Sequence, residues 1–509
     1  MRSSLLGLLL LLSGCPSRSD VRFCNATTPC KDPGFPFCDE ATSECEAMPS
    51  LIGDLAGLDL SMPETNPPDL AVSVDLAGVD LAMPPPDLTP PPDLMPMCAS
   101  STTCTVPTAP YCDPALGICR ACTSNSECSA AAPVCNPNGS CRLCNASSEC
   151  ASGVCDLRGP ISTSSVGQCV DASDIVYVSN VTLGGPCVDG NGTSGSPYCQ
   201  VNTALANLGS KHFVKVAGSA TDYEPISYTG TSNLTVFISG PGRDVATPAH
   251  VVGAAGLNAV NLTPGTNAAV NVGIDGLTFS AVDHTVVYCE ANKGTNGSTA
   301  TLSVRNSLIE NGANGVRALS CTLTLVQNII RNASLPANNG DGVSVEVGSN
   351  WTVTNNIISG NATFGMFVDA ASGTGTFRFN TVANNGVKNA AGGIYCGKNT
   401  TLESSIITAN TKTAGAGGTQ FFAVSGAACT LSNVVTGADG IGNTGKLSGD
   451  AAFVSATDFR LSLNGGDLTK NVACCIDKIG VSSTNPSLDF ERDGRPRGLS
   501  WDVGADEVQ

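Results

Sequence analysis

The sequence predicts an all-β protein whose main part is a solenoid of stacked coils. Five segments are copies of one unit: LSVRNSLIEN (302–311), LTLVQNIIRN (323–332), WTVTNNIISGN (351–361), TFRFNTVANN (376–385) and LESSIITAN (402–410). Each reads as an alternating apolar strand, a polar corner and a second short strand that ends on Asn. Aligned on the first strand, the copies step by 21, 28, 24 and 25 residues, which is typical of coils that each stack on their predecessor. Charged residues are only 13% of the chain, which also suits stacked β coils.

The first residues predict an exported protein. Residues 1–14 begin with Arg2, continue with a leucine-rich core (5–12) and end in small residues before Cys15. This core is too short to span a bilayer and is interpreted as a signal peptide. Its end resembles the lipobox of bacterial lipoproteins, which implies that residues 15–23 form a lipidated N-terminus anchored through Cys15 to the outer membrane or cell surface. The alternative is an ordinary secretory signal.

The charge of the chain argues against a nucleic-acid partner. Removal of residues 1–14 takes away Arg2 and changes the formal net charge from −18 to −19. An acidic protein repels the phosphate backbone. No later segment offers 18 uninterrupted apolar residues, so lipid is the only membrane attachment that we expect.

Twenty-five cysteines in an exported chain predict disulfide bonds. Sixteen of them form four modules: Cys24, Cys30, Cys38 and Cys45; Cys98, Cys104, Cys112 and Cys119; Cys122, Cys128, Cys135 and Cys141; and Cys144, Cys150, Cys155 and Cys169. Modules this small need bridges to hold them, and each allows three pairings. Module 1 spans residues 24–45 and modules 2–4 span residues 98–171. The run ACTSNSECSAAAPVCNPNGSCRLC (121–144) resembles the small cysteine-rich modules of secreted bacterial proteins and, more loosely, Dickkopf-like modules. A zinc site is the alternative, but the C-x2-C pairs cross module boundaries.

Residues 46–97 predict a disordered linker between module 1 and the other modules. Asp-Leu dyads alternate there with Pro runs, without any Lys or Arg. Isolated leucines among like charges and prolines cannot collapse into a core. The segment is therefore interpreted as a spacer, with a role in binding a partner or calcium as the alternative.

The β domain is placed at residues 174–509. Its N-terminal cap (176–208) resembles the first segment of secreted right-handed parallel β-helix proteins. That resemblance implies a first strand, a loop clasped by a Cys187–Cys199 bridge, and a capping helix over Gln200 to Leu208. A calcium loop near Asp189 is the alternative, but the EF-hand pattern there lacks its Gly and its Glu.

Eight to ten coils are expected, and their corners carry a polar column. Its members are Ser307, Asn328, Asn356, Asn380 and Ser405. Their side chains are expected to bond to the coils above and below, or Asn simply tolerates a left-handed corner, or both hold. Separations of about one enlarged coil predict the bridges Cys289–Cys321 and Cys396–Cys429. The adjacent Cys474 and Cys475 form a vicinal bridge or stay unpaired.

The C-terminal segment (489–509) resembles the terminal segment of many β-helix surface proteins. Its alternating acids and arginines are expected to pair in salt bridges that finish a sheet edge, with a metal site at Asp489, Asp493 and Asp502 as the alternative. Together, residues 174–509 resemble the pectate-lyase-like superfamily. The resemblance implies the fold but no activity, because this fold hosts many functions.

One column of outward side chains is the candidate site. Four segments share a register set by a leading glycine: GVRAL (315–319), GVSVE (342–346), GMFVD (365–369) and GIYCG (393–397). Alternation points Arg317, Ser344, Phe367 and Tyr395 outward in one stack, with Glu346 and Asp369 beside it. Two carboxylates about 5 Å apart suit calcium binding or acid–base chemistry on a sugar. The alternative is two solvated acids. The three histidines (212, 250 and 284) are interpreted as ordinary surface residues.

The function expected from these observations is that of a non-catalytic surface lipoprotein. Its β-helix would be presented for adhesion, glycan binding or envelope binding. The alternative is a carbohydrate-active enzyme, a polysaccharide lyase or glycoside hydrolase, that uses the Glu346/Asp369 face with Arg317 and Tyr395. The sequence shows no Asp-Asp pair or Gly-His-Gly signature in its coils, which favours the first function. Calcium is the candidate cofactor at this face, and a polysaccharide or an envelope component is the expected ligand.

Overall fold

The computed structural model describes two compact units, residues 1–90 and 91–509. In the first unit it describes β1 (Phe37–Asp39), which pairs antiparallel with β2 (Glu44–Glu46). In the second it describes residues 98, 100–158, 166–181, 187–291, 297–334, 340–386, 392–411, 427–436, 445–480, 482 and 485–508, and the backbone of 421–423. Cys15, the signal peptide and the linker from residue 47 to 97 lie outside the described residues. No helix within the described ranges is long and apolar enough to cross a membrane.

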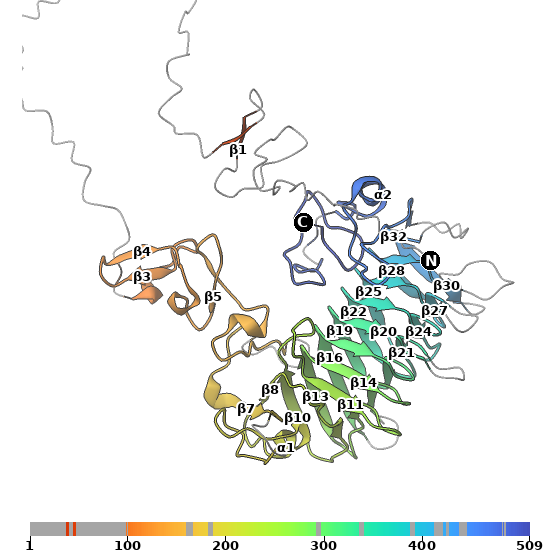
Figure 1. The fold of residues 1–509 in the computed structure, drawn as a ribbon, viewed down its shortest axis with the longest axis horizontal. Coiled ribbons are helices and arrows are strands. Elements are labelled where there is room, and N and C mark those ends of the chain that lie inside the picture. Colours follow the sequence, from red (N-terminus) through yellow and green to blue (C-terminus); the bar gives the residue numbers. More distant parts are fainter. Residues whose placement is uncertain are drawn as a thin grey trace, which may run out of the picture. The chain divides into compact units, whose positions relative to one another are not determined.

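Three parallel sheets form the main body of the second unit (Figure 1). The ten-stranded sheet contains β7 (Ile175–Val178), β8 (Phe213–Val216), β10 (Leu234–Ser239), β13 (Ala269–Asp275), β16 (Thr299–Arg305), β19 (Thr322–Val326), β22 (Asn350–Thr354), β25 (Gly375–Arg378), β28 (Thr400–Glu403) and β31 (Cys429–Ser432). The nine-stranded sheet contains β11 (His250–Gly253), β14 (Thr278–Ala281), β17 (Leu308–Glu310), β20 (Ile329–Arg331), β23 (Ile357–Ser359), β26 (Thr381–Ala383), β29 (Ile406–Thr408), β32 (Val434–Val435) and β33 (Lys446–Leu447). The eight-stranded sheet contains β9 (Ile226–Tyr228), β12 (Val260–Leu262), β15 (Val287–Glu290), β18 (Val316–Leu319), β21 (Val343–Val345), β24 (Met366–Val368), β27 (Ile394–Cys396) and β30 (Phe421–Ala423).

From β10 to β30 each coil contributes one strand to each sheet, so the prediction of stacked coils is confirmed. The unit LSVRNSLIEN supplies β16 and β17, and the glycine-led segment that follows is the third strand, β18. The predicted alignment of the copies is the observed register, since Val304, Leu325 and Val353 are paired in turn. Their side chains point inward and are fully buried. The period-2 pattern of each strand thus builds a continuous apolar core along the solenoid.

At the first corner of each coil, two neighbouring residues perform the two roles that the sequence left open for Asn, the left-handed backbone and the side-chain ladder. The left-handed residue comes first, with φ between 47° and 60° at Asn306, Gln327, Asn355, Phe379, Ser404 and Asn433. The next residue forms the buried ladder. Asn328 Nδ2 donates to Asn356 Oδ1 at 3.0 Å, and Asn356 Nδ2 donates to Asn380 Oδ1 at 3.1 Å. Each amide also donates to a backbone carbonyl of the preceding coil, as Asn356 does to Leu325 at 2.9 Å. The ladder is therefore confirmed, in a column of its own.

The second corner carries another ladder, which the closing Asn of each unit only partly indicates. Asn361 Nδ2 donates to Asn385 Oδ1 at 2.9 Å, and Asn385 Nδ2 donates to Asn410 Oδ1 at 2.9 Å. The closing Asn311 and Asn332 do not belong to this column. They occupy the left-handed position one residue earlier, with φ of 59° and 58°, because their units are one residue shorter than the unit that ends at Asn361.

A helix covers the first coil, and cysteine-rich module 4 packs on the outer face of the ten-stranded sheet beside it. Helix α1 (Val201–Ala206) buries Val201 and Ala204 against the core, and a Cys187–Cys199 disulfide clasps the loop before it. Module 4 shares a buried cluster with Phe213 and Phe237 on the outer face of β8 and β10. The contact is also polar: Lys215 Nζ donates to Ser152 O at 2.8 Å. Module 4 is therefore part of the β-helix body, whereas the sequence suggested modules held by bridges alone.

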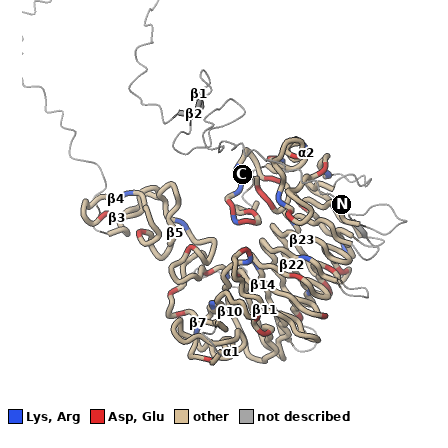
Figure 2. The backbone as a smooth tube through the Cα atoms, viewed as in Figure 1, with Lys and Arg blue, Asp and Glu red and all other residues tan. Residues whose placement is uncertain are grey.

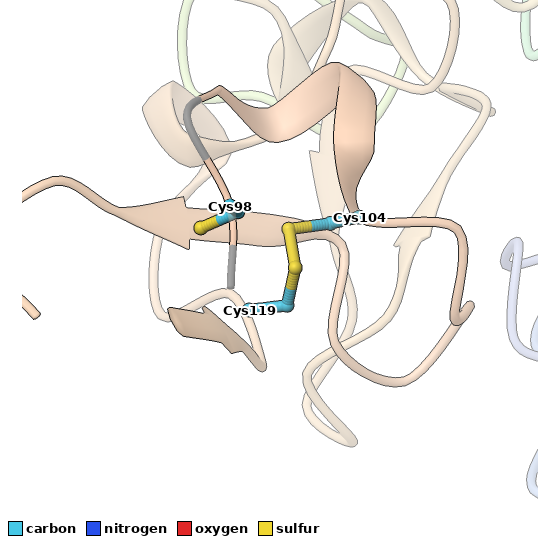
Figure 3. Close-up of side chains that lie close together, drawn as sticks. All are labelled: Cys98, Cys104 and Cys119. Atoms are coloured by element: carbon cyan, nitrogen blue, oxygen red, sulfur yellow. A yellow bond between two sulfur atoms is a disulfide. The ribbon is translucent and has the colours of Figure 1, made fainter. Parts of the chain in front are cut away.

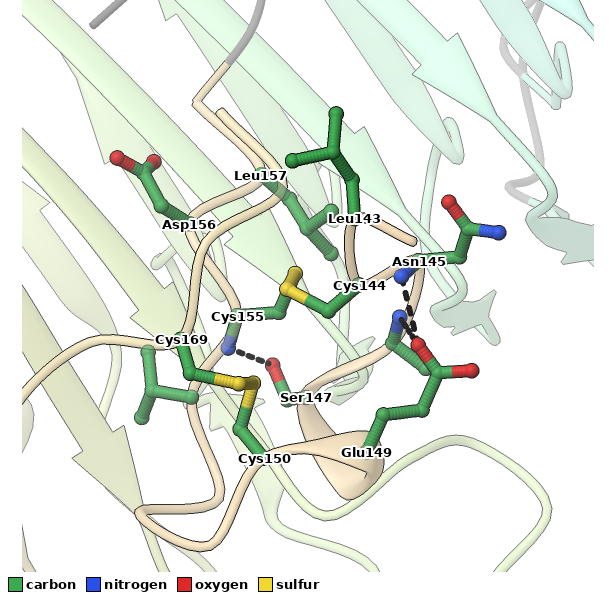
Figure 4. Close-up of a disulfide and its surroundings, with 12 residues drawn as sticks. Leu143, Cys144, Asn145, Ser147, Glu149, Cys150, Cys155, Asp156, Leu157 and Cys169 are labelled. Carbon is green, nitrogen blue, oxygen red and sulfur yellow. Dashed lines mark hydrogen bonds between the residues drawn. A yellow bond between two sulfur atoms is a disulfide. The ribbon is translucent and has the colours of Figure 1, made fainter. Parts of the chain in front are cut away.

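Modules 2–4 share one disulfide pairing, first to third and second to fourth cysteine. The bonds are Cys98–Cys112, Cys104–Cys119, Cys122–Cys135, Cys128–Cys141, Cys144–Cys155 and Cys150–Cys169. Each module begins with a 3-10 turn, which is followed by an antiparallel pairing. In module 2, η2 (Ser101–Thr103) precedes β3 (Tyr111–Asp113) and β4 (Ile118–Arg120), and in module 3, η3 (Asn125–Glu127) precedes β5 (Val134–Cys135) and β6 (Cys141–Arg142). In module 4, η4 (Ser147–Glu149) precedes a single β-bridge between Cys155 and Cys169. In module 4, Ser147 Oγ accepts the Cys155 N–H at 3.3 Å (Figure 4). Turn η5 (Ala172–Asp174) then leads into β7.

Further disulfides tie neighbouring coils and the C-terminal region. Cys289 is bonded to Cys321 and Cys396 to Cys429, the two pairs expected from their spacing, with Cα atoms 6.0 and 5.6 Å apart. Helix α2 (Gly465–Cys474) ends at a vicinal disulfide between Cys474 and Cys475, both fully buried. Of the two alternatives that the sequence left open, a vicinal bridge or unpaired thiols, the structure contains the bridge.

The C-terminal segment forms a strap along the first corner of the coils. Asn355 Nδ2 donates to Leu488 O at 2.6 Å, and the Gly504 N–H donates to Ser404 O at 3.0 Å. At its far side Arg492 is paired with Asp275. Acids and arginines do pair within it, as in Arg497–Asp493 at 2.7 Å, and Figure 2 shows both charges close together there. The strap crosses several coils and does not finish a sheet edge, because its backbone groups form hydrogen bonds with polar groups at the corners of those coils.

We expect Asn356→Ala to destabilise the protein by about 2–4 kcal/mol, because the buried amide of Asn328 and a carbonyl of the preceding coil lose their partner. Denaturant titration measures this change. Asn207→Ala, at an exposed position after α1, serves as the control and should change stability by less than about 0.5 kcal/mol. Equal effects of the two substitutions would contradict a structural role for the ladder.

Stability should fall as pH rises from about 4 to about 7, through buried acids of the strap. Burial raises the pKa of Asp506 to about 6 and that of Asp502 to about 7. The folded state therefore binds protons that the unfolded state, with a carboxyl pKa of about 4, has released. This stabilisation is fully present below pH 4 and is lost above the folded pKa.

Asp506→Asn should reduce the decrease in stability with rising pH. The variant should be more stable than the wild type at pH 8 but not at pH 4. Thermal unfolding at both pH values measures it, with the exposed Asp171→Asn as control. An identical pH dependence of wild type and Asp506→Asn would contradict the assignment.

Candidate functional site

The candidate site lies on the outer face of the eight-stranded sheet. The expected register is observed: Arg317 pairs with Ser344, Ser344 with Phe367, and Phe367 with Tyr395. The column also extends one coil back, to Tyr288 beside Arg317. The leading glycines are required here, because a Cβ at Gly342 would lie 2.6 Å from the carbonyl oxygen of Gly365 in the next coil. Close stacking at these positions thus aligns the side chains that follow.

The two predicted carboxylates have different partners. Glu346 makes a bidentate pair with Arg317, at 2.7 Å to Nε and 3.0 Å to Nη2, and it accepts the Ser344 hydroxyl at 3.0 Å. These hydrogen bonds raise the pKa of Arg317 above its ordinary value. Asp369 Oδ1 instead accepts the Ala371 N–H at 2.7 Å within its own turn. The structure therefore brings Glu346 to Arg317, and gives Asp369 the role of a turn residue.

Asp341 is a further acid at this site that the sequence interpretation missed. It is partly buried, accepts the Thr363 hydroxyl, and accepts the Phe364 N–H at 3.2 Å. Burial is the main cause that raises the pKa of Asp341 to about 6, against the hydrogen bonds from Thr363 and Phe364; the charge of Glu346 contributes to the rise and that of Arg317 opposes it. Both neighbours are thus close enough to act on it. Asp341 directly precedes the leading glycine, so aligning the segments one residue earlier would have revealed it.

Three aromatic rings lie beside these charges. Phe367 and Tyr395 are stacked, with ring centroids 4.6 Å apart and an interplanar angle of 12°. Phe364 leans against Tyr395 at 5.2 Å. All three are partly exposed. Together with the Arg317–Glu346 pair and Asp341 they form what we call the aromatic face, which combines flat apolar surfaces with hydrogen-bonding groups.

The one kind of ligand cluster found in the described part of the chain consists of cysteines. Three groups of Sγ atoms lie within 4.8 Å of one another: Cys98, Cys104 and Cys119; Cys122, Cys128 and Cys135; and Cys144, Cys150 and Cys169. Every one of these sulfurs is in a disulfide, as Figure 3 shows for Cys104 and Cys119. They therefore offer no thiolates to zinc. Asp489, Asp493 and Asp502 do not form such a group.

Comparison with a protein-family model supports the fold. A family model described as a right-handed β-helix region matches residues 259–449. Among solved structures, the crystal structure of pectate lyase Pel9A is similar at 16% identity and a TM-score of 0.27, over 66% of this chain and 96% of that one. No curated protein matches the chain. With its three parallel sheets, the second unit is a right-handed parallel β-helix that carries disulfide-bonded modules at its N-terminal side.

Proposed function

We propose that this protein is a lipoprotein anchored through Cys15 to the outer membrane or cell surface, and that its aromatic face binds a polysaccharide. The observation that carries the proposal is the group of Phe364, Phe367 and Tyr395 next to the Arg317–Glu346 pair. The protein would act in adhesion or in binding an envelope component, without catalysis.

The chemistry of the aromatic face supports a sugar ligand. Phe367 and Tyr395 stack on each other, so a ligand meets the apolar ring surfaces that this stack leaves exposed, and aromatic rings have a large apolar area with specific stacking geometry. Sugar rings present C–H groups on one face and hydroxyls at the edge, so the rings would contact the former. Arg317 and Glu346 are 39% and 20% exposed and satisfy each other in the free protein. They are thus held in place to exchange hydrogen bonds with sugar hydroxyls at little ordering cost.

Calcium belongs to the proposal as a bridging ion. Asp369 uses one carboxylate oxygen for its turn. Its other oxygen would bind calcium together with a carboxylate of an acidic polysaccharide, because calcium prefers several oxygen ligands. Calcium should then strengthen the binding of acidic glycans, relative to binding in the presence of a chelator, and should not strengthen the binding of neutral glycans.

A carbohydrate-active enzyme is the second candidate, and Asp341 favours it. Its raised pKa of about 6 contrasts with an ion-paired Glu346 nearby. Two carboxyl groups in different environments, one partly buried and one ion-paired, are the arrangement used for acid and base roles on a glycosidic bond. A polysaccharide lyase or glycoside hydrolase would place Asp341 as the acid, beside the aromatic rings that hold the sugar.

Phe367→Ala combined with Tyr395→Ala should weaken glycan binding at least about tenfold, because the stacking surface is lost. A glycan array followed by calorimetry on the full chain measures it, with and without calcium. Thr352→Ala combined with Thr376→Ala, on the outer face of the ten-stranded sheet, is the control. Unchanged binding by the aromatic double variant would refute this site. Release of new reducing or unsaturated ends that disappears in Asp341→Asn would instead establish the enzyme.

Cys15→Ser should release the protein from membranes, because no acyl chain can then be attached. Fractionation of cells that express the wild type and the variant, with metabolic labelling by a fatty acid, measures this. Cys474→Ser with Cys475→Ser is the control for loss of cysteines in general. A variant at Cys15 that still sediments with membranes would contradict the lipid anchor.

A further inference from the structure

A serine, a histidine and an aspartate are joined by hydrogen bonds on the outside of the first coils. His250 Nδ1 lies 2.8 Å from Asp222 Oδ1, and His250 Nε2 lies 2.9 Å from Ser280 Oγ. A carboxylate only accepts, so Nδ1 carries the proton and Nε2 of the neutral ring accepts the hydroxyl of Ser280. The histidine is thus held in the tautomer that leaves Nε2 free to act as a base.

The solenoid brings the three residues together. His250 begins β11 and pairs with Thr278 in β14 of the next coil, which places Ser280 on the same outward face two residues further on. Asp222 directly precedes Tyr223, which pairs with Val251 from the preceding coil. The three residues therefore come from three consecutive coils. Their separations of 28 and 30 residues carry no local signature, and His250 was accordingly interpreted as an ordinary surface residue.

We propose that Ser280, His250 and Asp222 form a catalytic triad that hydrolyses carboxylic esters. Ser280 is the nucleophile, His250 the general base and acid, and Asp222 a positioning residue that orients the ring. Such a triad is recognised by geometry and roles and recurs on unrelated folds. Both contacts lie within the reach expected of a nucleophile and its base.

A neighbouring hydroxyl fits the remaining role of oxyanion donor. Thr278 precedes Ser280 by two residues on the same face and is 6% exposed. Its Oγ1 has no hydrogen-bond partner among the described residues. A buried donor without a partner is costly. Rotation of the Thr278 side chain, whose Oγ1 is covered in the free protein, would let this hydroxyl donate to the oxyanion of a tetrahedral intermediate on Ser280.

The surroundings indicate an uncharged ester. The side chains of His250 and Asp222 are 29% and 59% exposed, so the triad lies on an open face that suits a group displayed on an extended polymer. Glu310 is in register with Ser280 on the next coil and is paired with Arg331 at 2.7 Å. This pair cancels the positive charge that an anionic substrate would need. The exposure also screens the His250–Asp222 interaction, so the rate should be modest.

The reaction proceeds in two steps. Ser280 Oγ bonds to the ester carbonyl carbon as its proton moves to His250 Nε2, and the leaving alcohol takes that proton when the carbon–oxygen bond breaks. Water then attacks the acyl group on Ser280 and gives a proton to His250. The acid leaves and Ser280 recovers its proton.

An alkyl fluorophosphonate, which bonds to an activated serine with loss of fluoride, tests the proposal on the full chain. Peptide mapping by mass spectrometry should find the adduct at Ser280. The adduct should be absent in Ser280→Ala and form at least about tenfold more slowly in His250→Gln. Ser359→Ala, in the same column of the nine-stranded sheet, and His284→Gln, whose ring contacts Asp283, should react like the wild type. No adduct at Ser280, or an unchanged rate in His250→Gln, overturns the proposal.

Hydrolysis of p-nitrophenyl acetate and butyrate separates the roles. Ser280→Ala should lower kcat/KM about a hundredfold, while Asp222→Asn and Thr278→Val should lower kcat with KM unchanged. A wild-type kcat in Asp222→Asn would show that the contact with His250 is only structural. Phe367→Ala with Tyr395→Ala should leave ester hydrolysis intact, so this proposal and glycan binding fail independently. Circular dichroism checks the fold of each variant.

Discussion

A coil of this β-helix can satisfy its polar groups only through its neighbours. Its strands are parallel, so backbone N–H and C=O groups are paired between successive coils and not within one. The corners are buried as well, and there Asn amides replace the regular ladder: Asn328 and Asn356 each bond to the preceding and the following coil, and the amide of Asn380 bonds to the preceding coil. Because a buried polar group without a partner is costly, the stack of hydrogen bonds holds every other feature of the domain in register.

At either end of the stack a coil has a neighbour on one side only, so its polar groups need other partners. The first coil is covered by α1, while module 4 packs against Phe213 and Phe237 on the outer face of the ten-stranded sheet. Later coils are tied sideways, by the coil-bridging disulfides and by the C-terminal strap. The strap bonds to Asn355 and Ser404 at the corner and reaches Asp275 several coils away. Ends and corners are therefore where this chain departs from its own repeat.

The same stacking explains where chemistry can appear. Inward positions are apolar and fully buried, so only outward columns are free to vary. On the eight-stranded sheet such a column gathers three aromatic rings, an Arg–Glu pair and a buried acid. On the nine-stranded sheet it places His250 between Asp222 and Ser280. In both cases the coil spacing of about 5 Å brings residues from successive coils within reach of one another.

By itself the sequence determined the repeat: the stacked strands, the inward apolar columns, the Asn ladder at the first corner and the bridges Cys289–Cys321 and Cys396–Cys429. These contacts join equivalent positions of adjacent coils, so they follow from the period of the pattern. Only the tertiary structure decided the pairing inside the modules, the docking of module 4, the path of the strap, the partner of Glu346 and the Ser280–His250–Asp222 contacts. The loops differ in length from coil to coil, and outward side chains contact residues at diagonal positions or in other segments of the chain. No fixed spacing in the sequence therefore reveals these contacts.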